Sequence, residues 1–332
     1  MCRESEVSII ECNFENLNNF GLIISSSTQC ALSACTFLNY SGSLLTFDNC
    51  RDVVLNRCSF RNGENAIVSS KCESVTISSC TFTTALQAFS FESAEKLLLS
   101  SSKFSHISNS SKLISCGNLS KIKDCCFTSA SLHLETCAGK ICQSNFENSK
   151  NALILNNDCT EISNNVFKNC EVGLRISSSS DSIISSCRFN SNSIGSLISN
   201  SRPVIANCII SDCQSGLIAL DESYLTLQES VCNSCQIAIS INSSRCLLLQ
   251  SAFEHCFVGV EFKKSVLHDS EEIFFKSCDV AVLINQSEVT IESFTATDCK
   301  LGVISTSDIS KLDIDQGVFE KVNVQLGHLQ TI

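Results

Sequence analysis

The 332-residue sequence predicts an all-β solenoid, in which short parallel strands coil around one long core. Three observations predict it. A motif of about 22 residues recurs along the chain, apolar residues alternate with Ser, Thr, Glu and Gln within each copy, and no segment keeps a helical apolar period. Because one such copy is too short to bury a core alone, neighbouring copies must stack on one another.

A phenylalanine that closes a short apolar stretch anchors the repeat. Twelve of the 20 Phe residues occupy this position, and successive anchors lie 19 to 23 residues apart. Stacked rings bury a large apolar area, so we expect the column to lie in the core. The fifteen anchors are Phe14, Phe37, Phe60, Phe82, Phe104, Phe127, Phe146, Phe167, Phe189, Ile210, Cys232, Phe253, Phe275, Ala296 and Phe319.

Polar and small residues keep the same register as the anchors. Two residues before the anchor the chain places mainly Cys or Ser, as at Cys35 and Ser102. Two residues after it come mainly Asn, Ser, Asp or His, which suits a buried or half-buried tight turn where side chains bond backbone groups or the next copy. His106 and His255 belong to this column, so we expect them to be ladder members and not catalytic residues.

A representative copy runs from Val166 to Ile176 and reads Val-Phe-Lys-Asn-Cys-Glu-Val-Gly-Leu-Arg-Ile. This repeat resembles the right-handed parallel β-helix of the pectin-lyase-like superfamily, over essentially the whole chain. The resemblance implies a single-stranded right-handed parallel β-helix of about 15 rungs of about 22 residues. We expect residues 1–332 to form one continuous domain. The resemblance says little about activity, because many activities share this scaffold.

The 24 cysteines could form a secreted disulfide framework or remain reduced. They fall into columns shared with Ser, Ala and Asn, the chain is long enough for a core without staples, and Met1–Glu6 shows no apolar leader. We therefore expect mostly buried thiols and favour a cytoplasmic location, with a secreted or cell-surface location as the alternative.

No metal or cofactor is expected from the cysteine spacing. Cys232 and Cys235 form a CxxC pair, but they belong to two different repeat columns, and no second pair follows at zinc-ribbon spacing; Cys125 and Cys126 are adjacent. The net charge of −11 argues against nucleic acid and anionic membranes as partners, and no apolar run is long enough for membrane insertion.

The enzymes of the resembled fold cleave polysaccharides, by β-elimination with an Arg or Lys base and Ca²⁺ or by hydrolysis with paired carboxylates. The polygalacturonase signatures Asn-Thr-Asp, Asp-Asp, Gly-His-Gly and Arg-Ile-Lys are missing, and Arg175-Ile176-Ser177 is the nearest fragment. The charged stretch Asp269–Glu272 is typical of a solvated turn, and no oxygen-rich loop frames Asp308, Asp313 and Asp315. No repeat is long enough for a cleft-building loop, so we name no catalytic residue and disfavour an enzyme without excluding one.

We favour a non-enzymatic scaffold that presents a long face to a protein partner. The alternatives are a surface or secreted adhesin-like rod, and a carbohydrate-binding or polysaccharide-degrading enzyme; an acidic groove across three rungs would favour the enzyme. Neither end of the sequence shows a helix or a polar cap. We therefore expect the chain to be part of a longer protein or to associate end-on with itself.

Overall fold

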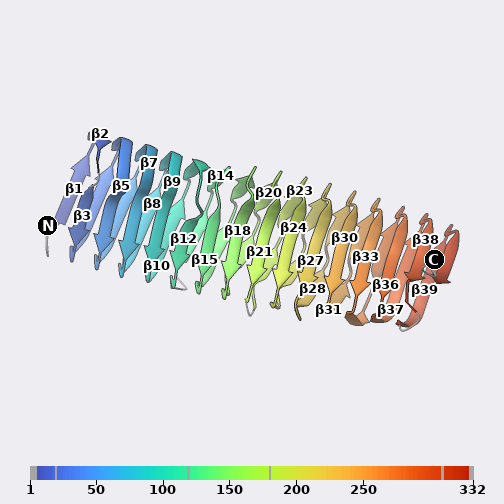
Figure 1. The fold of residues 1–332 in the computed structure, drawn as a ribbon. Helices are drawn as coiled ribbons and strands as arrows, with labels where there is room; N and C mark the ends of the chain where they lie inside the picture. Colours follow the sequence, from blue (N-terminus) through green and yellow to red (C-terminus); the bar gives the residue numbers. More distant parts are fainter. Residues whose placement is uncertain (1–5, 19–20, 118–119, 179–180, 308–309, 329–332) are drawn as a thin grey trace. The chain divides into compact units, whose positions relative to one another are not determined.

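A computed structural model describes residues 6–18, 21–117, 120–178, 181–307 and 310–328. Every regular element assigned to these residues is a β-strand, and neighbouring strands pair in parallel (Figure 1). The predicted all-β solenoid is confirmed, with about 14 turns instead of about 15 rungs, since fifteen anchors enclose fourteen intervals. The chain separates into two compact units, residues 1–165 (unit 1) and 166–332 (unit 2).

Each turn has three faces, which we number in chain order, and in unit 1 some strands span two of them. The first face contains β1 (Glu6–Ile10), β4 (Gln29–Ser33), β6 (Asp52–Asn56), β8 (Ser74–Ser78), β10 (Lys96–Ser100), β13 (Ser120–Lys123), β16 (Gly139–Cys142) and β19 (Glu161–Ser163). The second contains β2 (Asn13–Leu17), β11 (Lys103–Ile107), β14 (Cys126–Thr128) and β17 (Asn145–Glu147), and the third β3 (Leu22–Ser25), β12 (Ser111–Ile114), β15 (Leu132–Glu135) and β18 (Asn151–Asn156). The strands that run through both the second and third faces are β5 (Thr36–Asp48), β7 (Ser59–Ser70) and β9 (Thr81–Glu92).

Unit 2 repeats this arrangement. Its first face contains β22 (Ile183–Ser185), β25 (Val204–Ala206), β28 (Tyr224–Gln228), β31 (Arg245–Leu249) and β34 (Val266–Ser270). Its second contains β20 (Val166–Lys168), β23 (Arg188–Asn190), β26 (Ile209–Ser211), β29 (Val231–Asn233), β32 (Ala252–Glu254) and β35 (Ile273–Lys276). The third contains β21 (Val172–Ser177), β24 (Ile194–Ser199), β27 (Ser215–Leu220), β30 (Ile237–Asn242), β33 (Val258–Lys263), β36 (Val280–Asn285), β38 (Leu301–Ser305) and β40 (Val324–His328). Strands β37 (Glu288–Thr297) and β39 (Lys311–Glu320) run through the first and second faces.

The three corners between faces are each turned by one residue in the left-handed conformation. In one turn these are Ala34, Asn39 and Asn49, with φ of 53°, 54° and 51°. The Asn, Ser, Asp and His column lies at the second corner, so the predicted tight turn is confirmed, and His106 and His255 share it with φ of 54°. Short polar residues reach this conformation more readily than most because their side chains bond locally.

The column is mostly exposed, however, whereas the sequence suggested a buried or half-buried turn. A left-handed residue at a convex corner directs its side chain outward, which the backbone geometry decides and composition does not. The expected ladder does form at the start of the chain. Asn39 Nδ2 donates to Asn16 Oδ1 at 3.2 Å, and Asn62 Nδ2 donates to Asn39 Oδ1 at 3.4 Å.

The residue after each left-handed residue usually points inward. At these positions the Cys and Ser side chains form hydrogen bonds that join one turn to the next. The backbone N–H of Cys58 donates to Cys80 Sγ at 3.4 Å, and that of Cys80 donates to Ser102 Oγ at 3.1 Å. In turn, Cys80 Sγ donates to the Ser78 carbonyl two residues earlier. Cys, Ser and Asn interchange in these columns because each supplies an acceptor to the previous turn and a donor to the corner carbonyl.

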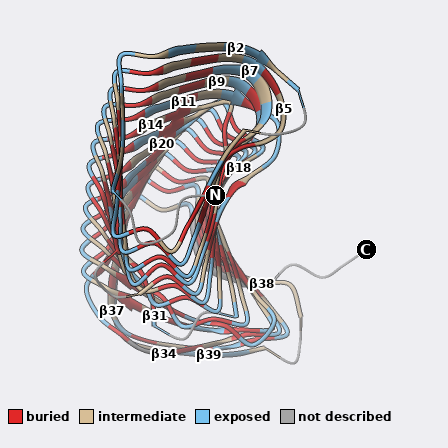
Figure 2. Cartoon of the chain, turned by 90° about the vertical axis from the view of Figure 1, so that its left-hand side faces the viewer, coloured by how far each residue is buried: buried red, intermediate tan, exposed pale blue. Residues whose placement is uncertain are grey.

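The anchor phenylalanines stack inside each unit, as predicted. In unit 1 the neighbouring rings from Phe14 to Phe146 have centroids 4.6–5.0 Å apart and interplanar angles of 3–9°. In unit 2, Phe167 stacks on Phe189 at 4.9 Å and Phe253 on Phe275 at 5.0 Å. Buried residues line the inner side of the turns in Figure 2.

The expected burial of the cysteines is also confirmed. Among the described cysteines Cys159 is exposed, Cys12 and Cys126 are half-buried, and the others are buried free thiols. Cys125 fills a corner of the core while its neighbour Cys126 faces outward, which is the alternation of a strand. Separately, no helix in the described part of the chain has the length and hydropathy that crossing a bilayer requires.

Candidate functional site

The acidic residues considered from the sequence do not converge. Asp313 and Asp315 are exposed on β39, Asp308 lies outside the described residues, and so does the side chain of Asp269. Arg175 is exposed on β21. Within the described residues no group of three or more His, Cys, Asp or Glu side chains is arranged to hold a metal ion.

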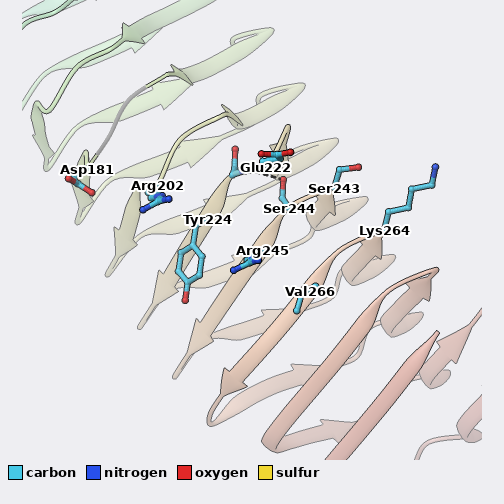
Figure 3. Close-up of a pocket in the computed structure, with 10 residues that line it drawn as sticks. Asp181, Arg202, Glu222, Tyr224, Ser243, Ser244, Arg245, Lys264 and Val266 are labelled. Atoms are coloured by element: carbon cyan, nitrogen blue, oxygen red, sulfur yellow. Dashed lines mark hydrogen bonds between the residues drawn. The ribbon is translucent and has the colours of Figure 1, made fainter. Parts of the chain in front are cut away.

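A groove of about 820 Å³ runs along the third corner of unit 2, where the third face of one turn leads into the first face of the next (Figure 3). Its inner edge is a row of side chains on successive turns. Tyr224 pairs in register with Arg245, and Arg245 with Val266. Arg202 lies one turn before Tyr224. The backbone N–H of Tyr224 donates to the carbonyl of Ser201, which is the residue before Arg202. Asp181 lies at the end of this row.

The floor of the groove is a serine ladder. The backbone N–H of Ser201 donates to Ser223 Oγ, that of Ser223 to Ser244 Oγ, and that of Ser244 to Ser265 Oγ, at 3.2–3.4 Å. The hydroxyls donate onward to corner carbonyls, as Ser244 Oγ does to Asn242 at 2.9 Å. Since each rung is bonded to the next, the floor holds its shape without a ligand.

The outer rim consists of Glu222, Ser243 and Lys264, which are left-handed corner residues with φ of 60°, 48° and 51°. One of these corners has an additional residue, because Asp221 and Glu222 are both left-handed. The side chain of Asp221 is held by a hydrogen bond, since Ser199 Oγ donates to its Oδ2 at 2.8 Å. The neighbouring Glu222 therefore stands at the rim of the groove.

The charge of this groove differs from that of the whole chain. Three cations, Arg202, Arg245 and Lys264, line it together with two carboxylates, Asp181 and Glu222, although the chain carries a net charge of −11. The ion pairs found among the described residues all involve other side chains. The three cations are exposed and remain available to a ligand.

The groove is built to bind a polar ligand with flat faces. Figure 3 shows Tyr224 between Arg202 and Arg245 in one row, so an aromatic ring has a guanidinium on either side, each one turn away. A Tyr ring offers an apolar face with a polar tip, and Arg presents a planar fork of donors to hydroxyl or carboxylate oxygens. Tyr224 is 39% exposed, so its ring is accessible to a ligand.

The groove crosses more than three turns, but it is not the acidic groove that would favour a hydrolase. Asp181 and Glu222 come from turns that are two rungs apart, and both are exposed. The general acid of a glycosidase pair is kept protonated by burial, which neither residue has. The sequence did contain the signal for this groove: Arg202, Tyr224 and Arg245 recur at the period of the repeat, which places charged and aromatic side chains on adjacent rungs.

Unit 1 has a second groove at its third corner, of about 490 Å³. There Arg51 pairs with Glu73 at 3.5 Å, and Lys71 and Glu95 also line the groove. Because the acidic and basic side chains balance one another and no aromatic ring is among the lining residues, this groove is less suited to the same ligand.

A family model described as "Right handed beta helix region" matches residues 1–93 and 130–270, which is more than half of the chain. The chain belongs to this family. The matched residues include those that line the groove of unit 2. The family assignment, with the parallel pairing of the strands, confirms that the repeat is that of a right-handed parallel β-helix.

Comparison with curated proteins finds no match. Among solved structures, the chain is similar to tailspike protein 3 of bacteriophage CBA120, with 10% identity over 86% of this chain and 51% of that one, and a TM-score of 0.47. It is also similar to a tailspike mutant of E. coli bacteriophage HK620 in complex with a pentasaccharide, with 9% identity over 93% and 70% and a TM-score of 0.46.

A third similar structure is the surface adhesin PfbA of Streptococcus pneumoniae, with 11% identity over 89% of this chain and 85% of that one, and a TM-score of 0.32. The chain spans about half the length of the CBA120 tailspike protein. The ligand and the adhesin role named for these structures belong to those proteins.

Proposed function

We propose that the protein is a non-enzymatic β-helix that binds a carbohydrate chain along the groove of unit 2. One observation supports this most directly: Tyr224 lies between Arg202 and Arg245 on consecutive rungs, and none of the three is engaged by a neighbouring ion pair among the described residues. A protein that binds sugars needs an accessible ring and fixed polar donors in one line, and this row supplies both.

The spacing of the row suits a polymer. Rungs repeat at about 4.8 Å, which is comparable with the length of one pyranose ring in an extended chain. A glycan lying along the corner therefore meets one rung per sugar. The ring of Tyr224 packs against the C–H face of one sugar, while Arg202 and Arg245 donate to oxygens of its neighbours.

The charge of the groove favours an acidic glycan over a neutral one. Three cations that form no ion pair within the described part of the chain line the groove with two carboxylates, and guanidinium groups bind carboxylates in a bidentate manner. Chains of this kind are found mainly outside the cytosol, so the proposal favours the surface or secreted location over the cytoplasmic one.

A protein partner is the second candidate, and exposed apolar side chains support it. Phe257 is 56% exposed, Phe274 is 48% exposed and Ile209 is 45% exposed, all in unit 2. Large apolar residues at a surface are typical of protein interfaces. The double substitution Phe257→Ser and Phe274→Ser would weaken the binding of a protein partner and leave glycan binding unchanged.

Glycan array binding followed by titration tests the proposal. We expect binding to acidic oligosaccharides of four or more sugars. Arg245→Ala should weaken it by about tenfold, the cost of losing a hydrogen bond to a charged group, and Tyr224→Ala should weaken it by about tenfold through loss of the ring that packs against a sugar. Arg51→Ala, in the groove of unit 1, is the matched control and should bind as the native chain does.

The thermal midpoint of each variant should stay unchanged, because these side chains are exposed. Glycan binding that is unchanged by both Tyr224→Ala and Arg245→Ala would contradict the proposed site, and so would the absence of any glycan ligand. New reducing ends or unsaturated uronates after incubation with a bound polysaccharide would show that the protein is an enzyme.

A further inference from the structure

The second face of unit 2 presents a row of outward side chains that are mostly apolar, on six consecutive turns. We call it the apolar row, and each member pairs in register with the member on the next turn. Its members are Ile209, Val231, Ala252, Phe274, Thr295 and Val318. Ile209 is 45% exposed, and Phe274 and Val318 are each 48% exposed.

The equivalent position in unit 1 is mostly polar, so the fold itself does not require apolar side chains there. From β2 to β17 this position contains Asn13, Thr36, Ser59, Thr81, Lys103, Cys126 and Asn145. Single apolar side chains at a surface are ordinary, whereas a contiguous row of them marks a surface that contacts another molecule. The apolar row is therefore a candidate interface.

Charged residues beside the apolar row indicate which molecule it contacts. A second outward row lies two residues further along each strand, and it contains Ser211, Asn233, Glu254, Lys276, Thr297 and Glu320. Glu254 and Lys276 occupy the two middle turns, and neither belongs to an ion pair within the described part of the chain. The midpoint of the apolar row thus has an acid on one side and a base on the other.

This pattern is complementary to itself. A twofold axis that runs along the strand direction, midway between the turns of Ala252 and Phe274, reverses the order of the turns in a second copy. The apolar row then lies against the same row of the second copy over all six turns. Phe274 lies opposite Ala252, so the largest side chain of the row meets the smallest, and Glu254 lies opposite Lys276.

The charges also select this register over its neighbours. Moving the axis onto the turn of Ala252 would place Glu254 opposite Glu254, and moving it onto the turn of Phe274 would place Lys276 opposite Lys276. Like charges that meet across an interface are unfavourable. The register that gives the apolar row its full overlap is therefore also the one that brings opposite charges together.

The corners that border the second face are compatible with the same arrangement. This matters because each copy carries a net charge of −11, which opposes the association of like chains. In the proposed register each acidic residue at the borders lies opposite a basic or neutral one. The pairs are Asp212 with Lys321, Glu229 with Ser293, Glu272 with Gln250, Asp298 with Ser234, and Glu320 with Ser211.

We propose that the second face of unit 2 binds the same face of a second copy, with the apolar rows in contact and the turns running in opposite directions. Sheets that pack face to face lie about 10 Å apart with their strands roughly aligned. Six turns extend over about 24 Å, so the contact buries less than the roughly 800 Å² per partner of a standard interface. The dimer is accordingly weak, with a dissociation constant in the micromolar range or above.

This dimer does not depend on the glycan groove, which lies at the third corner. It assigns a second copy as the protein that Ile209 and Phe274 contact. Sedimentation of the full chain, from low micromolar to several hundred micromolar concentration, measures the association. Phe274→Ser should weaken it by at least about tenfold, because Phe274 is the large apolar side chain at the centre of the row. Phe257→Ser is the matched control, since Phe257 is 56% exposed but lies past the second corner, just before β33.

Charge reversal tests the register. Glu254→Lys and Lys276→Glu should each weaken self-association by about tenfold, because each places like charges opposite one another. An equal mixture of the two single variants should associate as the native chain does, since every lysine of one then faces a glutamate of the other. The double variant Glu254→Lys and Lys276→Glu should also associate as the native chain does.

A native chain that stays monomeric at all concentrations would overturn the proposal, and so would a trimer or larger assembly. Two single variants that fail to associate when mixed, although each retains the circular dichroism of the native chain, would overturn the register. Glycan binding by Phe274→Ser should equal that of the native chain, and Arg245→Ala should still dimerise. Failure of the dimer and failure of the groove are therefore distinguished.

Discussion

Replacing Phe82 with Ala tests the anchor column at its centre. Phe82 is fully buried, and its ring stacks between Phe60 at 4.7 Å and Phe104 at 4.9 Å. Removing a buried Phe side chain costs about 3–5 kcal/mol, partly from lost apolar burial and partly from the cavity left behind. Loss of two stacked contacts places Phe82→Ala in the upper part of that range, at about 4–5 kcal/mol.

The control is Ser26→Lys, at a third corner of the same unit. Lys71 and Lys264 occupy equivalent corners with φ of 52° and 51°, close to the 52° of Ser26, so the backbone tolerates lysine there. We expect a change of less than about 0.5 kcal/mol.

Urea unfolding followed by far-ultraviolet circular dichroism measures both variants, with the slope of the transition compared as well as its midpoint. Neighbouring turns can unfold separately in a repeat protein, so a broadened transition in Phe82→Ala would itself locate the damage in unit 1. A loss below about 1 kcal/mol for Phe82→Ala, or equal losses in both variants, would refute the claim that the anchor column forms the core.

Two further predictions concern buried ionisable groups. Asp158 is 1% exposed at a third corner where other turns have Cys or Ser, and burial raises its pKa despite the bond that the Thr160 N–H donates to it. Because burial disfavours the carboxylate, the fold is relatively more stable where Asp158 is protonated, below the unfolded-state pKa of about 4. This relative stability is lost as the pH rises through the raised pKa of the folded state. Asp158→Ser should therefore raise the thermal midpoint at pH 7, and the difference in midpoint between the variant and the native chain should become smaller as the pH falls. A difference that does not change with pH would contradict the claim that the buried carboxylate causes it. We also expect alkylation of the native chain to label few cysteines and alkylation after unfolding to label most of them. Disulfides in both states would exclude a reducing location.

Much of the fold was predictable because every turn repeats the same constraints. The anchors recur at nearly constant spacing, and a column of Phe residues can be buried together only if each turn stacks on the last in one register. The Cys and Ser columns could be placed at corners for the same reason. Continuity of residues 1–332 as one domain and end-on association remain predictions.

Other features depended on the path of the backbone. Three left-handed corners occur in a turn, as at Ala34, Asn39 and Asn49, although the sequence indicated only one ladder, because conformation at the other two is set by stacking and is compatible with many residue types. The outward direction of the Asn column has the same origin. Nor does residue type show that Cys80 accepts the N–H of Cys58, since that bond exists only between stacked turns.

The groove and the buried cysteines at the second corner of unit 2 illustrate the division most clearly. Arg202, Tyr224 and Arg245 are more than twenty residues apart along the chain, and so are Cys235, Cys256 and Cys278. By itself, the sequence determined that these residues share a position in the repeat. Only the tertiary structure decided that one set faces solvent beside a serine floor and the other faces inward, because a left-handed corner reverses the inside and outside of the chain within a single residue.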